Sequence, residues 1–348
     1  MSTSESVLDT FTGWAAMAAG EPLQRHEFSP GPLGAEDVEV AVEYCGICHS
    51  DQSMIDNEWG NARYPFVPGH EVVGTVVRLG EQTRGLKLGQ RVGIGWYKGS
   101  CMHCSSCMEG SHQLCRTVKP TIVGSNGGFA NRVRAHWAWA IALPDSLDPS
   151  LAGPLFCAGS TVFSPLLEFG VKPTDRVGVV GIGGLGHMGI KLAHAMGAHV
   201  VAFTTSESKR NAARALGADD VVVSRNEDEM AAHVKSFDFI LNTVAAPHNL
   251  DAFTTLLKRD GTMTLVGAPA TPHPSPEVFN LIFRRRSIAG SMIGGIPETQ
   301  EMLDFCAEHG IVADIELIRG DEINEAWERM VKGDVKYRFV IDSATLAG

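Results

Sequence analysis

The chain lacks any apolar run close to the roughly 18–20 residues that a membrane-spanning helix needs. Its opening segment, MSTSESVLDT, has neither the basic start nor the apolar stretch of a secretory signal. Positive charge is also scarce, because 29 Lys and Arg face 40 Asp and Glu, for a formal net charge of −11. These absences argue against nucleic acid and anionic membranes as partners, and they leave the cytoplasm as the expected location.

The sequence also lacks internal repeats and low-complexity segments, and its 348 residues suffice for two domains. Up to about residue 144, short β-branched runs such as 38–44 and 72–79 are separated by Gly, Pro and Asp, which predicts a compact, partly barrel-like β domain. The following region predicts βαβ units on a parallel sheet. We expect strands at 176–180, 199–203, 220–223, 237–242 and 262–266, and helices at 186–196 and 207–216. After residue 287 we expect a strand, helices over 297–308 and 322–332, and a last strand over 337–341.

A glycine-rich segment, Gly181-Ile182-Gly183-Gly184-Leu185-Gly186, follows an expected strand and opens an expected helix. In that setting Gly181 permits a tight turn, Gly183 lets the backbone approach a pyrophosphate, and Gly186 allows close helix–strand packing. Glycines alone also fit a flexible loop, but the surrounding strands and helix favour a dinucleotide site.

The end of the second strand of this region lacks the Asp or Glu with which NAD enzymes hold the ribose 2′-hydroxyl. It carries hydroxyls and cations instead, namely Thr204, Thr205, Ser206, Lys209 and Arg210. These groups suit a 2′-phosphate and therefore favour NADP, although the two cations also fit a solvated helix face. We expect Glu207, an early helix residue, to point outward, where its charge suits the helix dipole.

Four of the eight cysteines occupy one short segment, with spacings of two, two and seven residues: Cys101, Cys104, Cys107 and Cys115. Four thiolates so closely spaced match a closed, tetrahedral structural zinc site when the thiols are kept reduced. Disulfide bonds among these cysteines remain an alternative only if the protein resides in an oxidising compartment.

A second set of zinc ligands is dispersed along the chain as Cys48, His70 and Cys157. Two thiolates and one imidazole leave a fourth position open, as a catalytic zinc requires. Taken singly, His70 and Cys157 also fit ordinary core positions. Cys45 and Cys48 have the spacing of a redox pair, but no thioredoxin-like unit surrounds them, so we expect Cys45, and also Cys306, to be small buried residues.

Several motifs together carry a family resemblance: Gly69-His70-Glu71, the four-cysteine segment, Gly181–Gly186 and Cys157-Ala-Gly-Ser-Thr161. In order and spacing the chain resembles zinc-containing medium-chain dehydrogenases of the cinnamyl alcohol dehydrogenase group, and within it the bacterial NADP-dependent aldehyde reductases. The resemblance covers nearly the whole chain. It implies an α/β protein with a mainly β, GroES-like catalytic domain (1–155 and 290–348) and a Rossmann NADP-binding domain (156–289). It also implies two zinc ions per chain, NADP(H) and a homodimer.

The resemblance gives each matching residue a role. Cys48, His70 and Cys157 would bind the catalytic zinc, Glu71 would lie beside it, and Asp51 would orient the zinc-bound imidazole. The remaining positions match the lining of the cofactor site: Thr161, Thr243, Gly267, Ser291, Met292, Ile293 and, near the diphosphate, Arg338.

One departure concerns the proton path. Many relatives carry a His where this sequence has Ser53, and a serine cannot act as an acid–base group near neutral pH. The loop after Cys115 also looks shorter than in the plant enzymes. His49 is the nearest titratable candidate for the proton path, and it equally fits a diphosphate contact.

The expected reaction is the reduction of an aldehyde. Zinc polarises the carbonyl, the nicotinamide delivers hydride, and the oxygen is protonated through the hydroxyl of Ser50, which relays the proton. Trp59, Trp96 and Met292 either line an apolar substrate pocket or pack in the core. Three alternatives stay open: an NAD-linked polyol or secondary alcohol dehydrogenase, a zinc-free enzyme like the quinone reductases, and a non-catalytic NADP-binding module.

Overall fold

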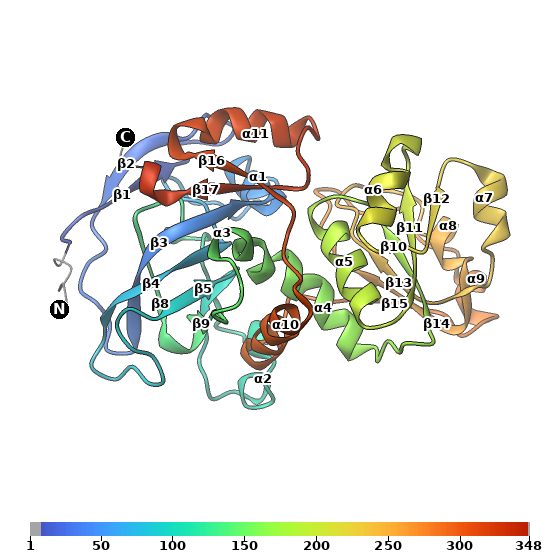
Figure 1. Ribbon diagram of the computed structural model, residues 1–348, viewed down its shortest axis with the longest axis horizontal. Coiled ribbons are helices and arrows are strands. Elements are labelled where there is room, and N and C mark those ends of the chain that lie inside the picture. Colours follow the sequence, from blue (N-terminus) through green and yellow to red (C-terminus); the bar gives the residue numbers. More distant parts are fainter. Residues whose placement is uncertain (1–7, 347–348) are drawn as a thin grey trace. The chain divides into compact units, whose positions relative to one another are not determined.

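The computed structural model describes residues 8–346 and divides into two compact units (Figure 1). The first comprises the described residues up to Cys157 together with those from Gly294 onward, and the second comprises Ala158–Ile293. The chain therefore leaves the first unit once and returns to it.

The first unit is built around a seven-stranded, mainly antiparallel sheet in the order β16-β17-β3-β4-β5-β9, with β8 also paired to β3. Its strands are β3 (Asp37–Ile47), β4 (Val72–Leu79), β5 (Arg91–Ile94), β8 (Arg132–His136), β9 (Ile141–Ala142), β16 (Ile315–Arg319) and β17 (Arg338–Asp342). Two small two-stranded antiparallel sheets accompany it: β1 (Phe11–Ala15) with β2 (Gln24–Phe28), and β6 (Tyr97–Gly99) with β7 (Lys119–Pro120). The β-branched residues of β3 and β4 supply much of its buried core.

Short helices complete the first unit. They are α1 (His49–Ile55), α2 (Ser105–Met108), η1 (His112–Leu114), η2 (Trp137–Trp139), α3 (Pro149–Ala152), η3 (Gly153–Phe156), α10 (Ile296–His309), η5 (Gly320–Glu322), α11 (Ile323–Val331) and η6 (Ser343–Thr345). The ends of α10 follow local rules. Glu298 accepts a hydrogen bond from the N–H of Gly295 at its start, and Gly310, with φ 64°, ends it in the left-handed region.

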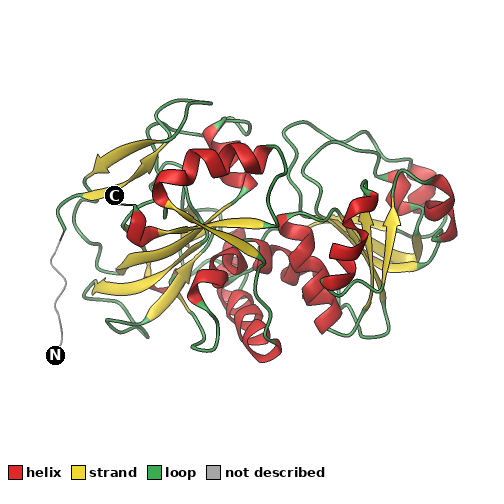
Figure 2. Cartoon of the chain, turned by 45° about the horizontal axis from the view of Figure 1, so that its top comes forward, coloured by secondary structure: helices red, strands yellow, loops and turns green. Residues whose placement is uncertain are grey.

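The second unit is a six-stranded sheet in the order β12-β11-β10-β13-β14-β15, in which all paired neighbours are parallel. Its strands are β10 (Arg176–Val180), β11 (His199–Thr204), β12 (Asp220–Val223), β13 (Phe237–Asn242), β14 (Leu257–Leu265) and β15 (Ser287–Gly290). Its helices are α4 (Ala158–Glu168), α5 (Gly184–Ala195), η4 (Glu207–Lys209), α6 (Arg210–Ala215), α7 (Glu227–Ala232), α8 (Asp251–Thr254) and α9 (Val278–Ile282), and helices cover both faces of this sheet (Figure 2). This strand order reverses direction between β10 and β13, and ligands of such sheets bind at the carboxyl ends of the strands there.

The architecture agrees with the expected fold class, because a mainly β unit accompanies a doubly wound parallel sheet of the Rossmann type. Two expected elements differ in detail. The helix expected over 207–216 is divided into η4 and α6. Strand β14 begins at Leu257, before the expected start at residue 262. The prediction missed the first half of the strand because it contains Asp260 and Gly261, residue types that are uncommon in strands.

Between residues 8 and 346, no single helix is long and apolar enough to cross a membrane. Only the bent helix pair Pro149–Phe156 and Ala158–Glu168 would be, by length and composition, when its two helices are taken together.

Candidate functional site

The four-cysteine segment folds into a compact lobe of the first unit. The ligand atoms of Cys101, Cys104, Cys107 and Cys115 all lie within 4.8 Å of one another. The sulfurs of Cys101 and Cys107 are 3.9 Å apart, close to the ~3.8 Å between two thiolates on one tetrahedral zinc. A hydrogen bond from the N–H of Cys101 lowers the pKa of Cys115 to about 6, which favours the thiolate. The eight cysteines, all in the described part of the chain, form no disulfide.

A second donor set lies buried in the same unit. Cys48 precedes α1, His70 and Glu71 precede β4, and Cys157 follows η3, yet their ligand atoms also lie within 4.8 Å of one another. The sulfurs of Cys48 and Cys157 are 3.9 Å apart, and the hydrogen bond between them lowers the pKa of Cys48. The segment before His70 turns through Gly69, whose φ of 98° is open to glycine and strained for other residues.

Asp51 organises this second set. Its Oδ1 accepts hydrogen bonds from the N–H of Gly69 and from Nδ1 of His70, both at 2.9 Å, and its Oδ2 accepts from the N–H of Cys48 at 3.0 Å. Because Nδ1 of His70 donates to a carboxylate, Nε2 is left as a lone-pair donor. Within residues 8–346, that buried Nε2 has no hydrogen-bond partner. An inward-facing imidazole nitrogen beside two thiols fits a zinc ion that keeps one coordination position open.

Glu71 and Arg338 form a buried pair beside the thiols. Nη2 of Arg338 lies 3.6 Å from Oε1 of Glu71, and the side chains are 4% and 0% exposed. Burial raises the pKa of Glu71 to about 7. Burial opposes the charge of Arg338, but Cys48 and Glu71 nevertheless hold its pKa above the ordinary value. A glycine at position 46 is needed for space, since a Cβ there would lie 2.0 Å from Oε2 of Glu71.

Arg338 was expected near the cofactor diphosphate. The structure places its guanidinium against Glu71 instead, where the cation offsets buried negative charge, so this position gives the diphosphate assignment no support.

Helix α1 carries the expected proton-path residues. His49 and Ser50 form its first turn, directly after Cys48. Ser53, one turn further on, donates a hydrogen bond of 2.7 Å to Oε2 of Glu58. Sequence reasoning missed Glu58, because Glu58 lies beyond the end of α1 and its spacing of five residues from Ser53 matches no helical pattern.

Two tryptophan rings, one contacting the other, lie next to His70. The ring of Trp96 lies edge-on to His70 with centroids 4.8 Å apart, and Trp59 meets Trp96 edge-on at 5.9 Å. Both also pack against the core of the first unit. The structure thus brings Trp59 and Trp96 together beside the second donor set, whereas Met292 lies in the second unit with 41% of its surface exposed.

The glycine-rich segment of the second unit has the geometry of a phosphate loop. Gly181 has φ 92°, and a Cβ at Gly186 would lie 1.9 Å from the carbonyl oxygen of Gly181. By contrast, a Cβ at Gly183 would meet nothing within 4 Å, so this backbone faces open space at the start of α5. Thr243, at the end of β13, donates a hydrogen bond of 2.8 Å to the carbonyl of Val180. The segment therefore lies at the reversal point of the sheet, where an anion can approach the helix N-terminus.

The five residues expected to select the 2′-phosphate do not behave alike. Thr204, Thr205 and Ser206 follow one another at the end of β11, and Nζ of Lys209 reaches back to the carbonyl of Ile182 in the glycine loop at 3.2 Å. Arg210 is held by Glu207 at 2.6 Å and by Glu229 at 2.8 Å, because it faces α7 and not the loop. Glu207 is 74% exposed and points outward as expected.

The other expected cofactor positions are spread over the second unit. Gly267 packs against the backbone of Val244, next to Thr243, and the N–H of Ser291 donates to Leu265 at 3.3 Å. Leu185 lies in α5 beside Gly184 and Gly186. Thr161 is buried in α4, and Ile293 has φ 32° at the end of the unit.

Sequence reasoning also missed a network after β13. Asn242 accepts a hydrogen bond from the N–H of Val244 at 3.2 Å and donates to Nε2 of His248 at 2.8 Å, while Nδ1 of His248 donates to the carbonyl of Ala246 at 2.8 Å. These bonds fix the course of the chain just after Thr243.

Comparisons with known proteins agree with this geometry. Residues 34–145 match the alcohol dehydrogenase GroES-like domain, and residues 184–308 match the zinc-binding dehydrogenase family. The aldehyde reductase YahK of Escherichia coli is 60% identical over 340 residues, which cover 95% of this chain and 97% of that protein.

Solved structures resemble the chain over almost its full length. A cinnamyl alcohol dehydrogenase from Sorghum bicolor has a TM-score of 0.93 at 41% identity, covering 96% of this chain and 98% of that one. The cinnamyl alcohol dehydrogenase of Helicobacter pylori complexed with NADP(H) has a TM-score of 0.90 at 34% identity, with the same coverage. The expected family is confirmed, and the chain belongs to the zinc-containing medium-chain alcohol dehydrogenases of the cinnamyl alcohol dehydrogenase group.

Proposed function

We propose that this protein is a zinc-dependent, NADP(H)-linked alcohol dehydrogenase that acts mainly as a reductase of aliphatic and aromatic aldehydes. The observation that carries the proposal is the buried group of Cys48, His70 and Cys157, with Nε2 of His70 aimed into it without a partner among the described residues. The names of the relatives support both the reductive direction and the cofactor. One relative is an aldehyde reductase, and another is complexed with NADP(H).

The residues of the first unit would divide the work. Cys48, His70 and Cys157 would hold one zinc, and Cys101, Cys104, Cys107 and Cys115 the other. The first ion supplies Lewis acidity toward a carbonyl oxygen. Asp51 would keep Nδ1 of His70 protonated, the hydroxyl of Ser50 would relay a proton to the substrate oxygen, and Glu71 with Arg338 would set the charge beside the thiols. Trp96 shields His70 from water.

The second unit would bind the cofactor, whose nicotinamide supplies the hydride. Gly183 presents open backbone to the pyrophosphate, while Thr204, Thr205 and Ser206 offer hydroxyls for the 2′-phosphate. Lys209 is the nearby cation, and Arg210 contributes by tying η4 and α6 to Glu229.

One experiment tests the function. The purified protein is assayed for oxidation of NADPH and of NADH with aliphatic and aromatic aldehydes, with ketones and quinones beside them, and for polyol oxidation. We expect fast NADPH oxidation with aldehydes. A preference for polyols with NAD, zinc-independent quinone reduction, or NADPH binding without turnover would each replace the proposal with one of its rivals.

We also propose a homodimer that forms through the second unit. Strand β15 is an unpaired edge within the described sheet, and α9 beside it in the chain exposes Val278, Phe279, Ile282 and Phe283, between 58% and 77% of each. Mass measurement in solution should give a dimer, and Phe283→Glu should shift it toward monomer. A wild-type monomer at all concentrations would contradict this. We propose a cytoplasmic location as well, where the eight free cysteines would stay reduced.

A further inference from the structure

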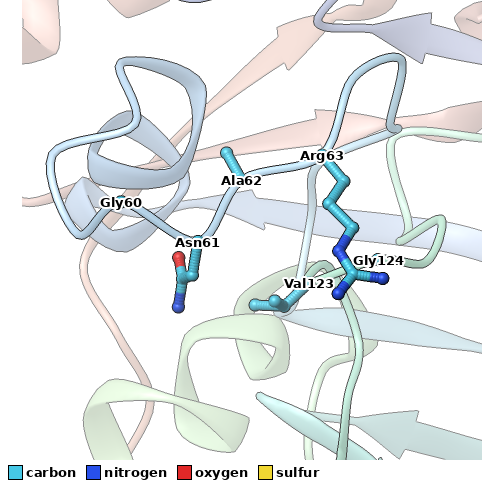
Figure 3. A pocket seen from close by; sticks show the side chains of 6 residues that line it. All are labelled: Gly60, Asn61, Ala62, Arg63, Val123 and Gly124. Carbon is cyan, nitrogen blue, oxygen red and sulfur yellow. The ribbon is translucent and has the colours of Figure 1, made fainter.

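The first unit contains a pocket that lies apart from both cysteine sets. It has a volume of about 480 Å³ and is lined on one side by residues 60–63, and on the other by Val123 and Gly124 (Figure 3). That volume suits a small organic molecule or one end of a larger one. Its wall contains one cation, Arg63, and no acidic residue.

The Arg63 guanidinium is available for a ligand. In the described part of the chain, no carboxylate forms an ion pair with it and no hydrogen bond engages its nitrogens. The side chain extends over Gly124, where a Cβ would lie 3.7 Å from Cδ and 3.9 Å from Nη1 of Arg63. The amide of Asn61 lies on the same wall of the pocket. The guanidinium fork of an arginine recognises a planar carboxylate.

A series of aromatic contacts leads from the residue before the pocket to His70. Gly60 directly follows Trp59, which contacts Trp96 at 5.9 Å, and Trp96 contacts His70 at 4.8 Å. Trp59, Trp96, Ala62 and Val123 all pack against the same core. A ligand with one end at His70 and an apolar body along the two tryptophans would have its other end near Gly60, in the same pocket lining as Arg63.

We propose that this pocket is a subsite for an acidic group, and that Arg63 makes the protein selective for aldehydes that carry a carboxylate at the far end of an aromatic or extended apolar body. The inference rests on the proposed aldehyde reduction and adds the substrate class. In a chain with a net charge of −11, long-range electrostatics disfavour anionic substrates, so any preference for one must come from a local cation.

The test compares 4-formylbenzoate with its neutral methyl ester. Wild-type kcat/KM should favour the acid by about tenfold, the effect of one charge-assisted contact in a partly open pocket. Arg63→Gln should abolish the preference by lowering kcat/KM for the acid alone, and Arg63→Lys should retain part of it because the fork geometry is lost.

Arg84→Gln is the matched control. It removes the same charge from an exposed position beyond the far end of β4, whose eight residues span about 27 Å from the end near His70. The preference should survive in this variant. An equal effect of Arg63→Gln and Arg84→Gln would reduce the result to net charge and overturn the subsite.

A binding measurement separates this inference from the proposed function. Calorimetry on the zinc-loaded protein without cofactor compares 4-(hydroxymethyl)benzoate with benzyl alcohol, in wild type and in Arg63→Gln. We expect about tenfold tighter binding of the acid, lost in the variant. Failure to reduce either aldehyde would refute the proposed function while this measurement still decides the subsite. Equal affinity of the acid and the neutral alcohol for wild type would overturn the subsite even if aldehydes are reduced.

Discussion

Replacing Asp51 by Asn should weaken zinc binding at the second donor set and destabilise the first unit. Asp51 is fully buried, and its carboxylate accepts three hydrogen bonds, two of them from the backbone N–H groups of Cys48 and Gly69. An amide has only one acceptor oxygen. If that oxygen keeps Gly69 and His70, the new NH2 group faces the N–H of Cys48 across about 3.0 Å, donor against donor.

The magnitude follows from these contacts. One buried N–H left unsatisfied costs about 1–3 kcal/mol, and the two bonds that remain lose roughly 1 kcal/mol each without the charge. Relief of burying a carboxylate offsets part of this, so we expect a net loss of about 2–3 kcal/mol. Zinc affinity should fall by about 10- to 100-fold, because the ring of His70 is no longer held by an anion.

Two assays measure these effects separately. Competition with a chromophoric chelator gives zinc affinity, and urea unfolding of the metal-free protein gives the cost to the fold. Asp56→Asn is the control, since Asp56 lies at the end of the same helix and, within residues 8–346, its side chain forms a hydrogen bond only with the side chain of Gln52. If Asp51→Asn bound zinc within twofold of wild type, Asp51 would not be the residue that orients His70.

Three further outcomes are expected. Cys104→Ser should reduce the zinc content measured by elemental analysis from two ions per chain to one and lower the thermal midpoint, whereas Cys306→Ala, buried away from both sets, should keep two ions. Thr205→Asp with Lys209→Ala should narrow or reverse the preference for NADPH over NADH in kcat/KM, because a carboxylate repels the 2′-phosphate; equal values for both cofactors in wild type would contradict the assignment. Ser50→Ala should lower kcat for an aldehyde about 100-fold or more, with zinc content and NADPH affinity retained, whereas His49→Ala should mainly weaken NADPH binding in a fluorescence titration. Near wild-type turnover in Ser50→Ala, with chemistry shown to limit the rate, would exclude Ser50 from the proton path.

The sequence predicts best where local residues decide the structure. The strands β10, β12 and β13 have the bounds expected from their β-branched and aromatic runs, and the four cysteines near position 100 are close in sequence as well as in space. Helix α7 escaped prediction because EDEMAA has no apolar stripe, and its stability comes from Asn226, which caps its first N–H groups. Strand β16 was not predicted because, at this sheet edge, only Ile318 of its five residues is buried.

Contacts between residues distant in the sequence explain where the site differs from the prediction. Lys209 and Arg210 look equivalent as neighbours in the sequence, but Glu229, 19 residues further on, binds Arg210 and leaves Lys209 to the glycine loop. The Ser53–Glu58 bond likewise gives a polar partner to a residue that seemed only to interrupt a proton path. In each case the outcome depends on a carboxylate whose position follows from the folded chain and not from a local pattern.

The charge balance of the catalytic donor set depends on the sheet as a whole. Strands β17, β3 and β4 are neighbours, so the pairing that places Phe339 opposite Ile47 also brings Arg338 to the end of β3 that leads into Cys48. The same order sets Glu71, just before β4, beside Gly46, the position without a side chain that makes room for it. A buried Glu71 without Arg338 would be costly, and a buried Arg338 without the thiol and the carboxylate would be costlier still. The last strand of the chain is therefore part of the site, because it supplies the cation that lets two thiols, an imidazole and a carboxylate share one buried space.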